Sequence, residues 1–205
     1  LISSSTLAEH HKRLKATLQQ LKESGLTLHK DKCSFFEPRV ECFGFVFSQE
    51  GLQVDLRKSA AIKEAPAQKN PTEIRSFLGM ATYCARFIPN LARLSEPLRA
   101  LTKTGAKWVC DPGEQEAFEN IKNALLTDAN MAYFEPKKAT ELVVDTSLVG
   151  LGVVLTQEHE PGIWSPLAFA SRALTATEAR YAQIEHEALA IKWACHHIHL
   201  YVYGR

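Results

Sequence analysis

Three short β-type segments in succession, followed by one long amphipathic segment, constrain the fold of this chain more than any other feature. Residues 141–145, 149–157 and 163–170 are apolar or alternating runs separated by short turns. Such a succession predicts an antiparallel meander, in which each strand pairs with the next along the chain. A long helix is predicted to begin at Thr177. Its spacing predicts a buried stripe of Tyr181, Ile184, Ala188, Ile191 and Cys195.

The middle of the chain has the period of helices. A short helix is predicted over 55–65, and Pro66 ends it. Asn70 and Pro71 form an N-cap followed by proline at the first helical position, and a further helix is predicted to start after the pair at 111–112. The residues predicted to face inward are Ile74, Phe77, Leu78, Ala81 and Ala85 in one helix, and Phe118, Ile121 and Leu125 in the other.

The first fifty residues combine one helix with strands. Thr6 and Glu9 match a capping box, and Gly25 matches a helix stop. Strands are predicted at 26–28 and 40–47, and a turn after residue 47 predicts a small antiparallel hairpin. The apolar stripe of the helix consists of Leu7, Leu14, Leu18 and Leu21.

These patterns predict an α+β chain in three parts, divided at its least regular segments. Residues 1–52 should form a helix plus a β-hairpin, and residues 53–130 a helical unit. Residues 131–205 should form three antiparallel strands plus a helix.

Charge is distributed unevenly, although the formal net charge is only +1. Residues 53–110 contain ten Lys or Arg and four Asp or Glu, whereas residues 111–205 contain seven and thirteen. A basic middle beside an acidic end suggests that one part contacts a polyanion while the other holds cations. A solvated basic face would give the same composition.

The composition excludes some classes of protein. No apolar run approaches the ~20 residues that cross a bilayer, so no membrane contact is predicted. Cys195 with His186, His196, His197 and His199 would suggest zinc, but neighbouring helix positions point apart and no second ligand cluster exists. Five separated cysteines predict reduced thiols in an intracellular protein of unknown compartment: Cys33, Cys42, Cys84, Cys110 and Cys195.

Two carboxylates stand where burial would be costly. Asp145 ends the first strand of the meander, and Glu187 lies three residues after Ile184 and four before Ile191. A half-buried carboxylate needs a cation or a hydrogen-bond donor. The pair would suit a divalent metal, with Mg²⁺ favoured by oxygen ligands, although acidic residues near strand ends are also common without one.

The order of motifs resembles the reverse transcriptase of gypsy-type LTR retrotransposons over essentially the whole chain. The opening segment, which ends in LHKDKCSFF, resembles the palm, and VECFGFVFSQEGLQVDLRK resembles the hairpin that grips the primer. NPTEIRSFLGMATYCARFIPNLARLSEPLRALTK resembles the thumb, and KWVCDPGEQEAFENIKNALL the segment leading out of it. TELVVDTSLVGLGVVLTQ and YAQIEHEALAIKWACHHIHLYVYGR resemble the first strands and first helix of RNase H. The three parts would then be the end of the palm, the thumb and the start of an RNase H-like domain.

The resemblance implies an RNA-directed DNA polymerase with a Mg²⁺-dependent RNase H. Asp145 and Glu187 match two RNase H carboxylates, which in that family share two Mg²⁺ ions. The family places a further aspartate after a YGR-like sequence, and the polymerase aspartates before residue 1. Both active sites are therefore expected to be truncated, and this chain alone is expected to be inactive. Thr146 stands where the family has alanine, and residues 82–86 lack its tyrosine–arginine-rich run.

The implied partners are an RNA–DNA hybrid or primer–template and the rest of the Pol polyprotein. Phosphate contacts by Lys and Arg are sensitive to salt and indifferent to base sequence. Each candidate could equally be a solvated surface residue. The candidates are Lys69, Arg75, Arg86 and Arg93.

Phe43 and Gly44 are candidates for a hairpin tip beside the primer backbone, where glycine permits close approach. The alternative is that Phe43 belongs to the core. Two alternatives to the enzyme hypothesis stay open. One is a non-enzymatic nucleic-acid-binding protein derived from a retroelement, and the other is a decayed fragment without function.

Overall fold

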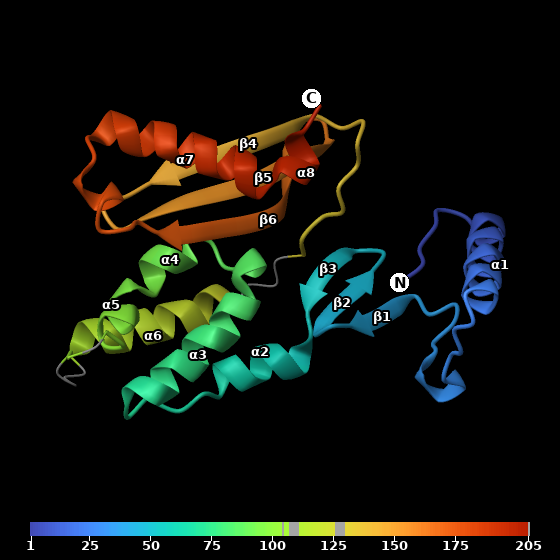
Figure 1. Cartoon of the computed structure of the whole chain (residues 1–205), viewed down its shortest axis with the longest axis horizontal. Helices are drawn as coiled ribbons and strands as arrows, with labels where there is room; N and C mark the ends of the chain where they lie inside the picture. The colour runs from blue at the N-terminus through green and yellow to red at the C-terminus, as the bar shows by residue number, and fades with distance from the viewer. Residues whose placement is uncertain (104, 107–110, 126–129, 205) are drawn as a thin grey trace.

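The computed structural model describes residues 1–103, 105–106, 111–125 and 130–204. Helices combine with two three-stranded antiparallel sheets, which confirms the predicted mixed fold class. Figure 1 shows the C-terminal sheet packed over a helical unit, with the N-terminal sheet beside that unit and the first helix at the far end.

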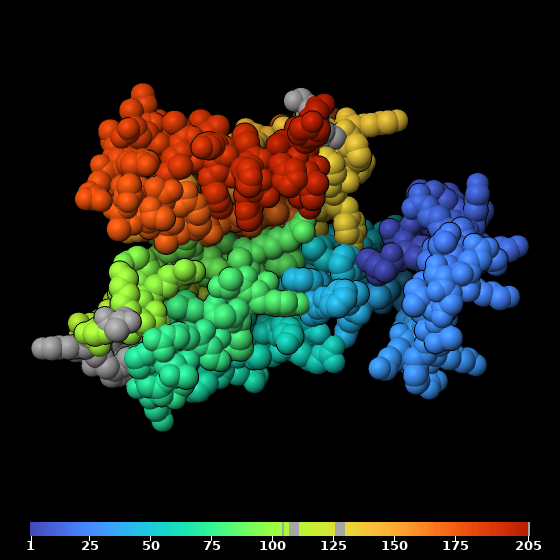
Figure 2. Space-filling view, in the orientation of Figure 1, coloured from blue at the N-terminus to red at the C-terminus, as the bar shows by residue number. Residues whose placement is uncertain are grey.

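The first helix stands apart from the rest of the chain. α1 (Leu7–Glu23) begins after Thr6, whose side chain accepts a hydrogen bond from the Glu9 amide at 3.2 Å. Gly25 follows the end of α1 with a φ of 71°, as a helix stop requires. The predicted apolar stripe is at most half-buried, because α1 contains no buried residue, and Figure 2 shows this lobe protruding from the molecule.

The N-terminal sheet contains two hairpins where one was predicted. Its strands pair antiparallel in sequence order: β1 (Arg39–Cys42), β2 (Phe45–Ser48) and β3 (Gly51–Val54). The predicted hairpin after residue 47 is confirmed. The predicted strand at 40–47 is interrupted by a turn at Phe43 and Gly44. The predicted strand at 26–28 is wrong, because an isolated extended segment without a paired neighbour does not form a ladder.

The helical unit forms as its capping signals predict. Asp55 caps α2, and Asn70 caps α3 by accepting a hydrogen bond from the Glu73 amide at 2.9 Å. The predicted inward residues Ile74, Phe77 and Phe118 are buried in one hydrophobic core. The elements are α2 (Leu56–Lys63), α3 (Pro71–Tyr83), η2 (Ala85–Phe87), α4 (Leu91–Leu94), α5 (Glu96–Ala100) and α6 (Pro112–Leu125).

The predicted meander is confirmed in the C-terminal part. Its strands pair antiparallel in the order β4-β5-β6, so β4 lies at an edge of the sheet. A second core forms between this sheet and the helix that follows it. The elements are β4 (Thr140–Thr146), β5 (Gly150–Glu160), β6 (Ile163–Ala173), η3 (Glu178–Arg180), α7 (Gln183–His197) and α8 (His199–Val202).

Two expectations about the long helix are wrong. α7 begins at Gln183, because the backbone is extended at Tyr181 and Ala182 after the short turn η3. The stripe facing the sheet is also different, since Ile184 and Ile191 are 75% and 56% exposed. The buried residues are His186, Ala190 and Ala194. The small side chains of the two alanines let the helix lie close to the sheet.

A short connector joins the two sheets. Leu52 and Met131 exchange backbone hydrogen bonds of 2.9 and 3.0 Å, which adds Met131 to the edge of β3. The Tyr133 hydroxyl accepts a hydrogen bond from the Ser48 amide at 3.2 Å. The Ala132 amide donates to the carbonyl of Pro166 on β6 at 2.9 Å. Residues 131–133 therefore contact both sheets.

The division into three domains stays a prediction. Leu52 and Met131, on either side of the helical unit, both pack in its core. Among the described residues, no helix combines the length and apolar character needed to cross a bilayer. Cys33, Cys42, Cys84 and Cys195 are free, and Cys110 lies outside the described residues.

Candidate functional site

Asp145 lies near the end of β4, opposite Gly152 in the register with β5. Side chains alternate along a strand, and Leu142 and Val144 pack in the core beneath α7. Asp145 therefore points to the other face of the sheet, toward the helical unit. The small cleft there is lined by Asn90, Arg93, Asp145, Ser147, Gly150, Leu151, Gly152 and Ser171.

The helical unit approaches this face closely because β5 carries glycine at two positions. A side chain at position 152 would collide with the Asn90 amide, and a Cβ at position 150 would lie 3.4 Å from the Cβ of Ala92. The Ala92 amide donates to the Ser171 hydroxyl at 2.9 Å. Asn90, Ala92 and Ser171 were not predicted from the sequence, since nothing local marks contacts between distant segments.

Glu187 is exposed at the margin of the buried face of α7. It lies one residue after His186 and three before Ala190, both of which are buried. Its carboxylate accepts a hydrogen bond from Gln183 Nε2 at 3.4 Å. Figure 1 shows the arrowhead of β4 beside the N-terminal half of α7.

The cleft around Asp145 does not include Glu187. Within the described parts of the chain, no group of three or more His, Cys, Asp or Glu side chains is placed to hold a metal ion. Mg²⁺ needs near-octahedral oxygen coordination. The carboxylates described here therefore do not by themselves fit a Mg²⁺ site.

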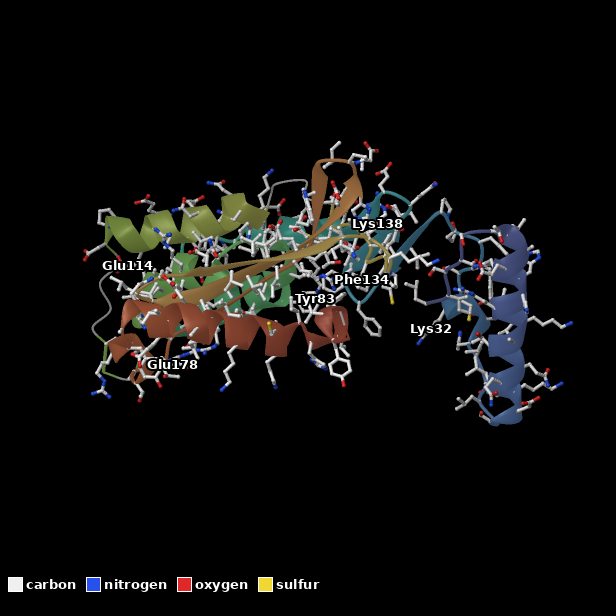
Figure 3. All side chains as sticks on the ribbon, turned by 90° about the horizontal axis from the view of Figure 1, so that it is seen from above. Lys32, Tyr83, Glu114, Phe134, Lys138 and Glu178 are labelled. Carbon is white, nitrogen blue, oxygen red and sulfur yellow. The ribbon has the colours of Figure 1, made fainter. Side chains whose placement is uncertain are left out.

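A charged network holds the segment that precedes α7. Arg172 on β6 donates two hydrogen bonds of 2.8 and 2.9 Å to the Glu178 carboxylate, and the Thr175 amide donates a third at 2.8 Å. His186 Nε2 lies 2.7 Å from the Glu178 carbonyl oxygen. Figure 3 shows Glu178 at the end of the domain where α7 begins. The hydrogen bonds from Arg172, followed by those from Thr175, lower the pKa of Glu178 to about 2.

This network predicts a dependence of stability on pH. Because the pKa of Glu178 falls from 4.5 to about 2 on folding, its contribution is complete above pH 4.5 and is lost as pH falls toward 2. Glu178→Gln is expected to lower the free energy of unfolding at pH 7 by about 1–3 kcal/mol. The difference from the wild type should shrink between pH 4.5 and 2 in urea unfolding, whereas the exposed control Glu160→Gln should show neither effect. A difference that is constant over this range would contradict the prediction.

The four basic candidates lie in different environments. Lys69, Arg75 and Arg93 are exposed, and Arg75 donates a hydrogen bond to the Thr102 carbonyl at 2.9 Å. Arg86 is half-buried and donates hydrogen bonds of 3.1 and 3.0 Å from Nε and Nη2 to the carbonyl of Leu167 on β6. Arg86 thus joins the helical unit to the C-terminal sheet, and its substitution would disturb that contact as well as any phosphate contact.

Phe43 and Gly44 form the tip of the first hairpin, as the register pair of Cys42 with Phe45 shows. Phe43 is 87% exposed, so the alternative that it belongs to the core is wrong. The Tyr83 hydroxyl donates a hydrogen bond to the Phe43 carbonyl oxygen. The sequence did not indicate this contact, because the two residues are 40 positions apart.

Residues 111–205 match the family described as an RNase H-like domain found in reverse transcriptase. The C-terminal part of the chain thus carries a domain of this class, which confirms the predicted resemblance at that level. The match begins at Asp111 and so includes α6.

The relatives by sequence are transposon polyproteins. The chain is 32% identical over 191 residues to the Transposon Tf2-3 polyprotein of Schizosaccharomyces pombe, and the Tf2-4 polyprotein of that organism matches equally. The alignment covers 93% of this chain and 14% of each polyprotein. The chain therefore spans about one seventh of the length of these relatives.

Two solved structures share the fold. One is a foamy viral protease-reverse transcriptase in complex with RNA/DNA hybrid, with a TM-score of 0.82 and 22% identity over 100% of this chain and 28% of that chain. The other is the dRH form of that protein in complex with double-stranded DNA, with a TM-score of 0.80 and 22% identity over 100% of this chain and 36% of that chain.

Proposed function

We infer that this chain is a segment of the polyprotein of a gypsy-type LTR retrotransposon, within its RNA-directed DNA polymerase and RNase H. The observation that carries this inference is the alignment of 93% of the chain with transposon polyproteins. The order of elements also supports it, because the hairpin, the helical unit and the RNase H-like sheet follow one another along the chain as the family resemblance implies. The alternative of a non-enzymatic binding protein is not favoured by these relatives.

In this proposal, the chain binds an RNA–DNA hybrid or primer–template through the helical unit and the first hairpin. Lys69 and Arg75 are exposed on the helical unit and can reach phosphate oxygens. The exposed ring of Phe43 can lie against a sugar or a base. The complexes named for the two foamy viral structures support nucleic acid as the ligand class.

Binding to an RNA–DNA hybrid is expected to be weak, independent of sequence and weakened by salt. Lys69→Glu combined with Arg75→Glu should lower the affinity and reduce the slope of log affinity against log salt by about 2, since each phosphate contact contributes about 1. Fluorescence anisotropy at several salt concentrations measures both quantities. Lys192→Glu, an exposed charge reversal on α7, is the matched control and should have a smaller effect. Affinity that does not change with salt would contradict the assignment.

Mg²⁺ is proposed as the cofactor of the RNase H activity on the family resemblance alone. The described carboxylates do not complete a site for it. Asp145 and Glu187 remain the proposed catalytic acids of the longer polyprotein, and no catalytic step is derived from their present arrangement.

A further inference from the structure

The tip of the first hairpin combines two features that rarely occur together. Phe43 has a φ of 50°, in the left-handed region that is unfavourable for a bulky residue, and Gly44 follows with a φ of 70°. Two-residue hairpin turns of this type usually contain asparagine or glycine at the position of Phe43. Its ring is nevertheless 87% exposed, so no packing of the ring compensates for the strain. Such strain persists only where the surroundings impose the conformation.

Tyr83, at the end of α3, holds this turn by two contacts. Its hydroxyl donates a hydrogen bond to the Phe43 carbonyl oxygen. Its ring stacks on Phe45, the first residue after the turn, with ring centroids 5.3 Å apart and an interplanar angle of 3°. The φ of Gly44 favours glycine, and a Cβ at position 44 would lie 3.0 Å from the Tyr83 hydroxyl, which is tighter than an ordinary contact.

The other side of the turn is held by the start of α2. The Asp55 amide donates to the Gly44 carbonyl at 3.0 Å, and Asp55 also caps α2. Figure 3 shows Tyr83 where the helical unit meets the strands of the N-terminal sheet. The two carbonyl groups of the turn are thus bound by Tyr83 of α3 and by the N-cap of α2, and the ring of Phe43 is left outside.

We propose that Tyr83 is a positioning residue, which holds the Phe43–Gly44 turn so that the Phe43 ring is presented to bound nucleic acid. The proposal rests on the proposed function, because it takes nucleic acid as the ligand. Tyr83 acts through the Phe43 carbonyl and the Phe45 ring, and the helical unit thereby sets the orientation of a residue on the neighbouring sheet. Tyr83 is 46% exposed, so its loss leaves no large cavity.

A double-mutant cycle tests this role with the 205-residue chain and a labelled RNA–DNA hybrid. Phe43→Ala should weaken binding about tenfold, the effect of losing one stacked aromatic ring. Tyr83→Phe removes only the hydroxyl and should weaken binding about fivefold, the effect of one hydrogen bond. In the Phe43→Ala background, Tyr83→Phe should have no further effect, because the ring that it orients is gone. Tyr203→Phe, at an exposed tyrosine near the C-terminal end, should bind as the wild type does.

Hydrogen exchange of the Asp55 amide supplies a second readout, since that amide donates to the turn. Tyr83→Phe should speed its exchange, with the melting temperature of the chain nearly unchanged. Equal binding by Tyr83→Phe and the wild type, while Phe43→Ala weakens binding, would overturn the positioning role and leave the proposed function intact. Additive effects of the two substitutions would also overturn it. If the chain shows no salt-sensitive binding of the hybrid, the proposed function itself fails.

Discussion

Gly51→Ala is expected to lower the free energy of unfolding by about 2–4 kcal/mol, because two costs coincide at this residue. Gly51 has a φ of 130°, a conformation that residues with a side chain rarely adopt. A Cβ there would also lie 2.6 Å from the backbone oxygen of Met131. To avoid this clash, the connector at Met131 would have to move away from β3. That movement would break the paired hydrogen bonds between Leu52 and Met131.

Urea unfolding measures this effect, and Gly79→Ala provides the control. Gly79 lies within α3, and a Cβ there meets nothing within 4 Å. Alanine is favoured over glycine inside a helix, so Gly79→Ala should raise the free energy of unfolding by about 0.5–1 kcal/mol. Equal stability of the two variants would show that the connector is not packed against β3 as described.

A longer chain that continues past Arg205 into the next strand of the polyprotein is expected to gain Mg²⁺-dependent cleavage of RNA in an RNA–DNA hybrid. The 205-residue chain should bind Mg²⁺ poorly and cleave little or nothing. Mg²⁺ gives up its bound water reluctantly, and two exposed carboxylates cannot by themselves replace that water. A labelled RNA strand, with and without Mg²⁺, measures the gain.

Asp145→Asn and Glu187→Gln should each abolish the cleavage gained by the longer chain, since both carboxylates are proposed metal ligands. Glu160→Gln, an exposed residue at the end of β5, should cleave normally. Cleavage that survives both substitutions would refute the assignment of these acids. The present placement of Asp145 on the face away from α7 makes this the most demanding test of the RNase H proposal.

Local signals predicted the elements well because their causes are local. Asn70 followed by Pro71 marks the start of α3, since a cap and a fixed φ act within one turn. The meander followed from alternation and short turns. The buried face of α7 could not be predicted in this way, because both His186 with Ala190 and Ile184 with Ile191 have helical spacing. The face with Ala190 and Ala194 is the buried one, because small side chains let the helix lie close to the sheet.

The candidate site was predicted only in part, for the same reason. Arg75 and Arg86 have the same side chain in the same basic segment, yet one is exposed and the other bonds to the Leu167 carbonyl. The difference in their environments comes from a residue distant in the sequence, since Leu167 lies 81 positions from Arg86. The pattern of residues placed Phe43 within a strand, and only the family resemblance suggested a hairpin tip there. The contact of Tyr83 with that tip was not predicted.

The position of β4 at the edge of its sheet, among the described strands, has a consequence for the behaviour of the isolated chain. An edge strand presents backbone amide and carbonyl groups that can pair with a strand from another molecule. Val143, near the middle of β4, is 46% exposed, and the exposed acids Glu141 and Asp145 lie on either side of it on the same face. These carboxylates would repel those of a second copy, so pairing of two isolated chains through β4 is expected to be opposed at neutral pH and to become easier as the acids are protonated.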